Sequence, residues 1–184
     1  MSSTAYSKIK GCRICGSTEL GEFLNIGEQA LSGRFPGPTE IDPPVAPLVV
    51  VRCKNCHLVQ LLHTVVAEEL YTYGYGYRSG TNETMQSHLA EIPAWLSKQC
   101  QLVSDDIVID IGSNDGTLLK SYEVPGLRRI GIDAIAGKFK DYYPADIKTI
   151  EGFFSSELAL QAVGARKAKA ITSIAMFYDL ENPG

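Results

Sequence analysis

The sequence predicts an α/β protein built from two parts, and two observations support this prediction. The first is a pair of CxxC motifs, Cys12–Cys15 and Cys53–Cys56, in the amino-terminal third. The second is a run of mostly β-branched residues, Ile107–Ile111, that leads into a loop with two glycines. Such a run is typical of a strand covered on both faces, as in parallel sheets. We therefore expect a small metal-binding domain followed by a Rossmann-like sheet.

Composition and charge limit the classes of function. The chain has 184 residues, of which 45% are hydrophobic, and this is enough for a packed core. Its formal charge of −4 argues against general affinity for nucleic acid or an anionic membrane. No apolar run approaches the roughly 20 residues of a membrane-spanning helix, and the first residues lack the apolar core of a secretory signal. We expect a cytoplasmic protein that binds neither nucleic acid nor a membrane.

Four of the five cysteines can hold one metal ion. The two-residue gap of each motif lets both of its thiolates point at a single ion, and in a reducing compartment metal explains the pairs better than disulfides do. Four thiolates suit a closed, tetrahedral, structural zinc site. The expected ligands, in a domain of residues 1–70, are Cys12, Cys15, Cys53 and Cys56. We expect His57 and His63 to be ordinary surface or packing residues.

The segment between the two motifs is expected to form a loop or a hairpin. Five prolines, Pro36, Pro38, Pro43, Pro44 and Pro47, favour extended structure over helix. Strands are expected at Val49–Val51 and Leu58–Leu61, on either side of the second motif. Residues 1–60 carry six basic and five acidic side chains, so this zinc module has no electrostatic footprint for phosphate backbones.

Residues 71–100 are expected to form a tyrosine-rich loop and a linker helix. The loop interleaves four tyrosines, from Tyr71 to Tyr77, with glycines. Tyrosine faces attract cations by about 0.5–2 kcal/mol per contact, but the same rings could instead pack one domain on the other. We expect Thr81 to cap the helix and Pro93 to kink or break it. Its apolar face should consist of Met85, Leu89, Ile92 and Leu96, with His88 beside it.

Residues 101–184 should form the partial Rossmann-like domain. After the glycine loop, Thr117–Tyr122 can begin a helix. Further strands are expected at Arg129–Asp133, Ile147–Glu151 and Lys169–Ala175. Ser155 or Ser156 should cap a helix that runs through Val163 and ends at Gly164.

The loop and the strand after it indicate a nucleoside-containing cofactor. Asp133, at the end of the second strand, can accept hydrogen bonds from both hydroxyls of an adenosine ribose. The loop lacks the third glycine of GxGxxG, and Asp110 and Asp115 would repel a pyrophosphate. A positively charged cofactor without phosphates, S-adenosylmethionine, fits better. An NAD-dependent enzyme and a non-catalytic zinc and nucleotide scaffold remain the alternatives.

Four sequence blocks, in order, resemble a known family. They are Cys12–Gly16 with Leu24–Gly27, Cys53–Gln60, Tyr75–Gly80 and Asp110–Gly116. Together they resemble the zinc-containing class I methyltransferases related to the sugar C-methyltransferases of deoxysugar pathways. The resemblance implies zinc on the four cysteines and S-adenosylmethionine near Tyr77, Ser79, Gly112, Asn114 and Asp133. We add Asp110 and Gly116 of the same loop to the expected cofactor site.

The resemblance also shapes what we expect of the reaction. It implies methylation of a small molecule such as a nucleotide sugar. Members of this family continue well past the fourth strand, so we expect this chain to be an amino-terminal fragment with an incomplete sheet edge that could self-associate. The family's catalytic tyrosine, glutamate and histidine cannot be mapped here, so the catalytic residues are unknown. Tyr178 and His88 are the candidates for a base in the present residues.

Overall fold

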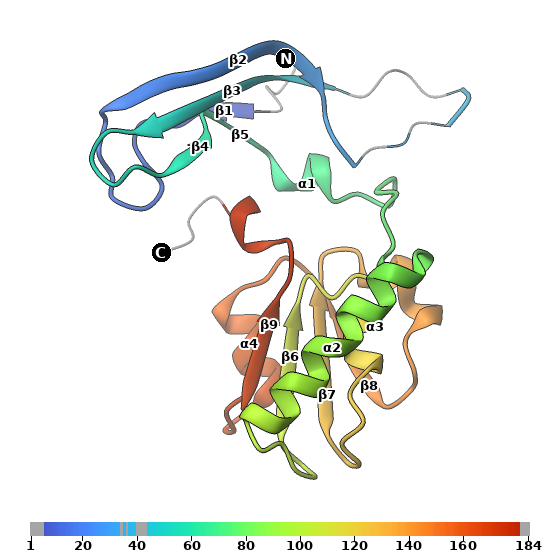
Figure 1. The fold of residues 1–184 in the computed structure, drawn as a ribbon. Coiled ribbons are helices and arrows are strands. Elements are labelled where there is room, and N and C mark those ends of the chain that lie inside the picture. The colour runs from blue at the N-terminus through green and yellow to red at the C-terminus, as the bar shows by residue number, and fades with distance from the viewer. Residues whose placement is uncertain (1–5, 34, 36, 40–43, 181–184) are drawn as a thin grey trace. The chain divides into compact units, whose positions relative to one another are not determined.

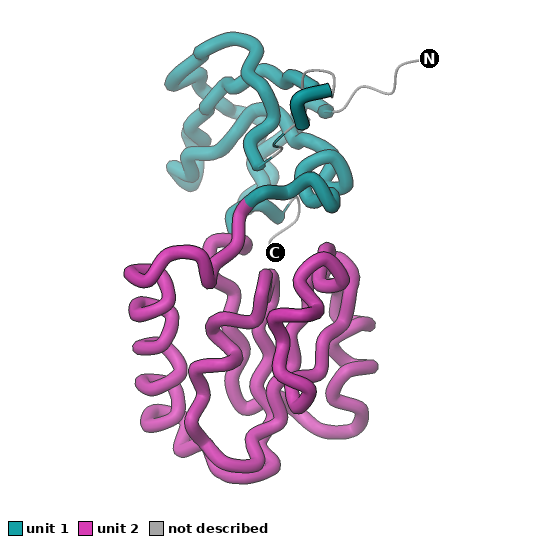
Figure 2. The backbone as a smooth tube through the Cα atoms, turned by 90° about the vertical axis from the view of Figure 1, so that its right-hand side faces the viewer, with its two compact units in different colours: residues 1–76, 178–184 teal, residues 77–177 magenta. Residues whose placement is uncertain are grey.

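The fold of the chain is given by a computed structural model that describes residues 6–33, 35, 37–39 and 44–180 (Figure 1). The backbone divides into two compact units (Figure 2). Unit 1 comprises Met1–Gly76 with Tyr178–Gly184, and unit 2 comprises Tyr77–Phe177. The three-part division expected from the sequence, with boundaries after residues 70 and 100, stays a prediction. Among the described residues, none of the helices combines the length and apolarity needed to cross a membrane.

Unit 1 is built on short antiparallel strands. Its main sheet has the order β2-β3-β4, and a second, two-stranded sheet pairs β1 with β5. The elements are β1 (Tyr6–Lys8), β2 (Leu20–Ala30), β3 (Val45–Cys53), β4 (Val59–Leu61), β5 (His63–Val65) and α1 (Ala67–Leu70).

The segment between the cysteine motifs forms the hairpin that the sequence allowed. β2 pairs with β3 from Leu20↔Cys53 to Ala30↔Val45, with two register shifts along its length. The strands expected around the second motif are confirmed within β3 and β4. Pro47 lies in β3 opposite Glu28, whereas Pro36 and Pro43 lie outside the described residues. The length of β2 was not predicted, because its Gly27, at φ 73°, and its register shifts disguise the alternation of a strand.

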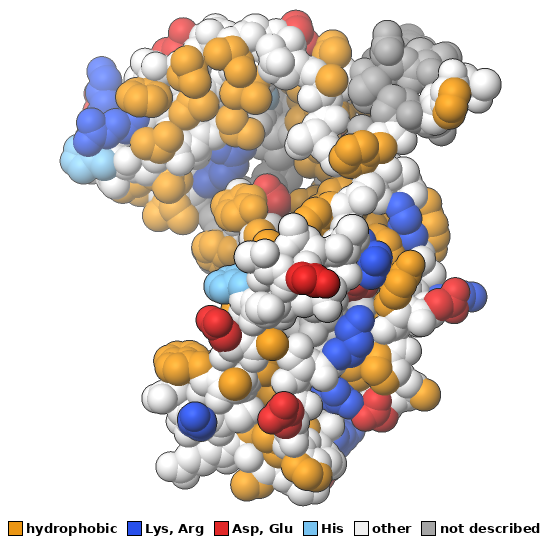
Figure 3. All heavy atoms as spheres, turned by 45° about the vertical axis from the view of Figure 1, so that its right-hand side comes forward, with side chains coloured by type: hydrophobic (Ala, Val, Ile, Leu, Met, Phe, Trp, Pro, Cys, Tyr) orange, Lys and Arg blue, Asp and Glu red, His pale blue; other side chains and the backbone are white. Residues whose placement is uncertain are grey.

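Many apolar side chains of unit 1 are exposed. On the face that Figure 3 shows, they gather over this unit. Examples are Phe23 (72% exposed), Val59 (55%) and Leu61 (49%). The sheet of unit 1 therefore buries little apolar surface of its own, so hydrophobic burial alone gives this unit limited stability.

Unit 2 is a four-stranded parallel sheet flanked by helices (Figure 1). Its strand order, β8-β7-β6-β9, corresponds to 3-2-1-4 in chain order, which is the order of a Rossmann-like sheet. The predicted fold class is confirmed. The strands are β6 (Ile107–Ile111), β7 (Arg128–Asp133), β8 (Ile147–Glu151) and β9 (Ala170–Ser173). The helices are η1 (Ser79–Thr81), α2 (Glu83–Gln99), α3 (Thr117–Lys120), η2 (Ala136–Tyr142) and α4 (Ser156–Val163), and η3 (Phe177–Asp179) follows β9.

Strand β6 lies at the centre of the core, and all five of its residues are buried. Val108 faces a cluster with Leu89 of α2 and Leu118 and Leu119 of α3. Its neighbours Ile107 and Ile109 face the opposite cluster, which includes Ala162 of α4. Because the side chains of a strand alternate between its faces, consecutive apolar residues such as Ile107, Val108 and Ile109 fill both layers.

Some expected details of unit 2 are wrong. Asn82, not Thr81, caps α2, and its side chain accepts a hydrogen bond from the N–H of Met85. The helix continues through Pro93, so the expected break is wrong, whereas a kink at Pro93 stays a prediction. Helix α3 ends at Lys120, earlier than Tyr122. The expected cap at Ser155 and the helix end at Gly164 are confirmed.

The sheet of unit 2 ends at β9, whose outer edge has no partner strand in the described part of the chain. Ile171 of β9 is 58% exposed. Self-association through this edge stays a prediction that light scattering can test. A single species with the mass of a monomer across a wide concentration range would contradict it.

Candidate metal centre and cofactor loop

The four cysteines of the two CxxC motifs converge on one point in unit 1. Their Sγ atoms all lie within 4.8 Å of one another. The distance from Cys12 to Cys56 is 3.5 Å, and that from Cys15 to Cys53 is 3.6 Å. A tetrahedral zinc site with Zn–S bonds of about 2.3 Å places its sulfur atoms about 3.8 Å apart. The four cysteines therefore fit a structural zinc ion.

The two motifs fold into matching knuckles. In each, the residue after the second cysteine has a left-handed backbone: Gly16 at φ 72° and His57 at φ 64°. Its N–H donates to the carbonyl of the first cysteine of the motif, Cys12 or Cys53. This turn points both thiols of a motif to the same side, which is what a shared ion needs.

The thiols do not ionise equally without a cation. Burial raises the pKa of Cys12, but N–H groups of Cys15 and Ile14 donate to it and bring the pKa down to about 6. Cys56 behaves in the opposite way: Leu58 lowers its pKa, but burial and the neighbouring thiols raise it to about 12. Four thiolates at this spacing repel one another, so a dication is required to hold all four ionised.

Neither expected bystander histidine joins the cysteine cluster in the described residues. His57 is exposed in the second knuckle. His63 packs its ring edge-on against Tyr6 with the centroids 5.5 Å apart. Four cysteines already complete a tetrahedral set, so both histidines play the packing or surface roles expected of them.

In unit 2 the glycine loop crosses the carboxyl ends of β6 and β7. Gly112 leaves β6 at φ 70° and donates its N–H to the carbonyl of Ile132 in β7. Asn114 and Gly116 also have positive φ, at 50° and 72°. A loop with three left-handed residues folds back sharply, so it exposes backbone groups where an open α/β sheet binds its ligand.

Asp133 lies at the end of β7 and contacts this loop. Its Oδ2 accepts a hydrogen bond from the N–H of Asn114 at 2.9 Å, and its Oδ1 accepts one from Ile135 at 2.8 Å. Each carboxylate oxygen has more than one lone pair, so both can still accept from a ligand hydroxyl. Burial raises the pKa of Asp133, although these two N–H groups oppose the shift.

Asp110 lies deeper, at the carboxyl end of β6. It is 4% exposed, and the hydroxyl of Thr172 in β9 donates to its Oδ1 at 2.6 Å. Burial raises its pKa to about 7, Thr172 opposes the shift, and the charge of Asp133 adds to it. Asp110 and Asp133 form a pair of carboxyl groups with no ion-pair partner among the described residues.

The raised pKa of Asp110 predicts a pH dependence of stability. A carboxyl group with a folded pKa above its unfolded value stabilises the fold at low pH, and this contribution is lost as the pH rises from about 4 through about 7. We expect Asp110→Asn to remove most of this loss, on the order of 2 kcal/mol between pH 5 and pH 8. Urea unfolding of both proteins at the two pH values checks this. A parallel decline in both would contradict it.

The third carboxylate of this region, Asp115, has a different environment. It is fully buried and forms an ion pair with Arg78 at 3.0 Å. The sequence suggested that Asp115 would repel a pyrophosphate from the loop. The structure instead turns this carboxylate inward, where Arg78 balances its charge.

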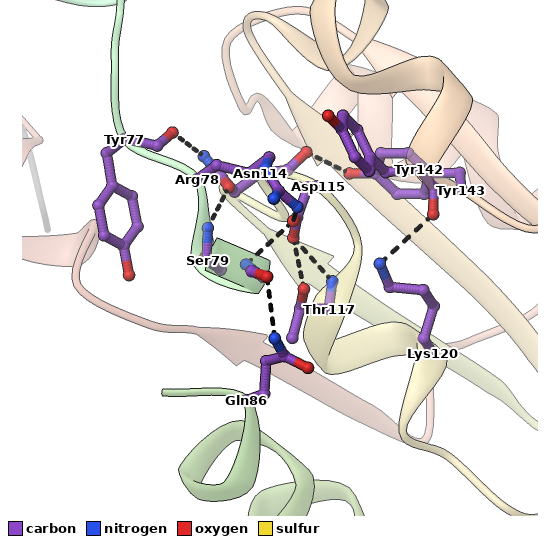
Figure 4. A network of polar contacts seen from close by, with 11 residues as sticks. Tyr77, Arg78, Ser79, Gln86, Asn114, Asp115, Thr117, Lys120, Tyr142 and Tyr143 are labelled. Carbon is purple, nitrogen blue, oxygen red and sulfur yellow. Dashed lines mark hydrogen bonds and ion pairs between the residues drawn. The ribbon is translucent and has the colours of Figure 1, made fainter. Parts of the chain in front are cut away.

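The segment Tyr77–Gly80 is hydrogen-bonded to the glycine loop (Figure 4). Asn114 accepts from the N–H of Ser79 at 2.9 Å and donates to the carbonyl of Tyr77 at 3.2 Å. Three residues that the resemblance assigned to the cofactor site, Tyr77, Ser79 and Asn114, are therefore neighbours in the structure. This segment also lines a hollow of about 360 Å³. The lining residues are Tyr77, Arg78, Ser79, Asn82, Thr84, Met85 and His88.

A residue in the turn after η2 supports the loop, and no pattern in the sequence indicated it. The hydroxyl of Tyr143 donates to the carbonyl of Asn114 at 2.7 Å and lies 2.8 Å from the hydroxyl of Ser113.

Of the two candidate bases, His88 lines the hollow in unit 2, whereas Tyr178 belongs to unit 1 and is 75% exposed.

Comparisons with known proteins support both the zinc-binding domain and the resemblance to methyltransferases. Residues 12–71 match a family described as "Putative zinc binding domain". The chain is 26% identical over 155 residues to "C-methyltransferase NovU" from Streptomyces niveus. That match covers 82% of this chain and 36% of NovU, so the chain spans about a third of that relative's length.

Precorrin-6y C5,15-methyltransferase from Geobacter metallireducens superposes with a TM-score of 0.39 and 12% identity, over 55% of each chain. The strand order, rather than this similarity, carries the assignment of the fold. Together, the matched zinc-binding domain and the relation to NovU confirm that this chain resembles the zinc-containing methyltransferases that its sequence blocks indicated.

Proposed function

We propose that this chain is the zinc-binding and cofactor-binding part of an S-adenosylmethionine-dependent methyltransferase. The observation that carries the proposal is a pair of carboxyl groups next to the glycine loop, those of Asp110 and Asp133. Two carboxyl groups without a cationic partner in the described residues favour a ligand with positive charge. The sulfonium and ammonium groups of S-adenosylmethionine provide that charge, and Asp133 can accept from its ribose hydroxyls.

The same loop is poorly suited to a pyrophosphate. In dinucleotide-binding sheets the pyrophosphate takes the N–H groups at the start of the helix after the loop. Here Asp115 accepts from the N–H of Thr117, the first residue of α3, at 3.1 Å. A carboxylate of the chain itself therefore occupies the anion position, and this disfavours NAD.

The chain's own residues would bind and orient the cofactor, which supplies an electrophilic methyl group when bound. Asp133 would hold the ribose, and Gly112 would let the backbone come close to the cofactor. Tyr77 and Ser79, which Asn114 holds by hydrogen bonds, would close one side. The zinc ion would have four thiolate ligands and no open position, so its role is to stabilise unit 1. The similarity to the C-methyltransferase NovU supports a carbon as the acceptor atom. The resemblance of the sequence blocks supports a sugar nucleotide or a related small molecule as the acceptor.

Isothermal titration tests the proposal. We expect S-adenosylhomocysteine to bind the zinc-loaded chain at one site with micromolar or tighter affinity, and NAD to give no binding heat. Asp133→Ala should weaken S-adenosylhomocysteine at least about tenfold, because a bidentate hydrogen-bond acceptor is lost. Glu91→Ala, on the exposed side of α2, is the control and should bind like the wild type. Binding of NAD without S-adenosylhomocysteine would contradict the proposal.

A further inference from the structure

The side chain of Asp115 points inward and is completely buried. Both of its carboxylate oxygens accept hydrogen bonds. Its Oδ2 accepts from Arg78 Nη1 and from the N–H of Gly80, both at 3.0 Å. Its Oδ1 accepts from the N–H and the hydroxyl of Thr117, at 3.1 and 2.6 Å. One oxygen thus faces the segment Tyr77–Gly80, and the other faces the glycine loop and α3.

These contacts keep the carboxylate charged. Burial raises the pKa of Asp115, but the donors from Thr117 and Gly80 outweigh it, so its pKa lies below the ordinary value. A buried ion pair of this kind adds little to stability compared with an apolar pair, because both charges lose their hydration. The ion pair instead fixes the position of Arg78 relative to Asp115, because its hydrogen bonds are short-ranged and directional.

Arg78 and Gly80 each have a feature that favours this contact with Asp115. The guanidinium of Arg78 lies 4.4 Å from the ring centroid of Tyr142, so it is held by a cation–π contact as well as by Asp115 (Figure 4). A Cβ atom on Gly80 would lie 2.6 Å from Oδ2 of Asp115 and 3.0 Å from Arg78 Nη1. Only glycine lets the backbone approach this closely.

We propose that Asp115 and Arg78 form a latch of positioning residues, which holds Tyr77 and Ser79 against the glycine loop in the arrangement that receives the cofactor. The inference rests on the proposed function. The latch joins the two elements assigned to the cofactor, because Asp115 follows Asn114 in the glycine loop and Arg78 lies between Tyr77 and Ser79. Opening the latch should therefore loosen one wall of the site without removing any group that contacts the cofactor.

The test separates affinity from folding. S-adenosylhomocysteine is titrated into the zinc-loaded wild type, Arg78→Met, Arg78→Lys and Asp115→Asn, and the dissociation constant and the binding stoichiometry are both measured. We expect Arg78→Met and Asp115→Asn to weaken binding at least about tenfold at unchanged stoichiometry. Arg78→Lys keeps the charge but not the planar stacking, so it should recover part of the affinity.

Asp105→Asn is the matched control. It breaks another Asp–Arg pair, with Arg166 at 2.8 Å, at the amino end of β6. It should leave the affinity within about twofold of the wild type because this pair is exposed. The latch is overturned if Arg78→Met and Arg78→Lys also bind within twofold, or if they lower only the stoichiometry and the melting temperature. No binding by the wild type would instead overturn the proposed function.

Discussion

Replacing Cys53 with serine is expected to abolish stoichiometric zinc binding and to unfold unit 1. Cys53 is fully buried, and its Sγ lies 3.6 Å from that of Cys15. A structural zinc site contributes on the order of 10 kcal/mol or more to folding. Unit 1 has few buried apolar residues to offset this loss. Metal analysis and circular dichroism of the purified variant check both effects.

Cys100→Ser is the matched control for this experiment. Cys100 is half-buried and packs against the core of unit 2, whereas the four metal-binding cysteines belong to unit 1. It should keep one zinc per chain and lose on the order of 1 kcal/mol of stability. Retention of a full zinc equivalent by Cys53→Ser would contradict the four-thiolate site.

Gly116→Ala is expected to destabilise unit 2 by about 3 kcal/mol. Gly116 has φ 72°, and a left-handed backbone costs a side-chain-bearing residue about 1–2 kcal/mol. Its Cβ would also lie 2.6 Å from Cε1 of Tyr143. Displacing that ring breaks the hydroxyl contacts of Tyr143 with Ser113 and Asn114. Overpacking of this kind adds about 1–3 kcal/mol.

Gly112→Ala separates the two causes of that loss. Gly112 has nearly the same φ, 70°, but its Cβ would meet only the flexible side chain of Met176, at 3.2 Å. This variant should lose about 1–2 kcal/mol, the backbone cost alone. Urea denaturation of the two variants provides the comparison. Equal losses would show that the ring of Tyr143 moves aside freely and that it does not fix the loop.

Much of the fold was predictable because local chemistry determines it. The β-branched run Ile107–Ile109, continued by Ile111, predicts a strand buried on both faces, and Ser155 is followed by a helical segment that Gly164 ends. The two CxxC motifs needed only their spacing to indicate a shared ion. In each case the residues that decide the structure lie within a few positions of one another.

The parts that were missed depend on distant residues. Arg78 and Asp115 are 37 positions apart, and from the sequence Asp115 was interpreted only as a charge facing the ligand. Tyr143 supports Asn114 from 29 positions away. The cap of α2 was assigned to Thr81, although Asn82 is an equally good capping residue one position later. Neither long-range polar contacts nor the choice between adjacent caps leaves a periodic signal.

The most direct test of the central claim, that the carboxyl ends of β6 and β7 bind the cofactor, is a nuclear magnetic resonance titration. ¹⁵N-labelled, zinc-loaded chain is titrated with S-adenosylhomocysteine, and the amide shifts are mapped. The proposal predicts the largest changes at Gly112, Asn114 and the residues after Asp133, with smaller ones at Ser79 and Gly80. Saturating ligand that leaves these amides unmoved, or that shifts mainly the amides of the zinc knuckles, would contradict it.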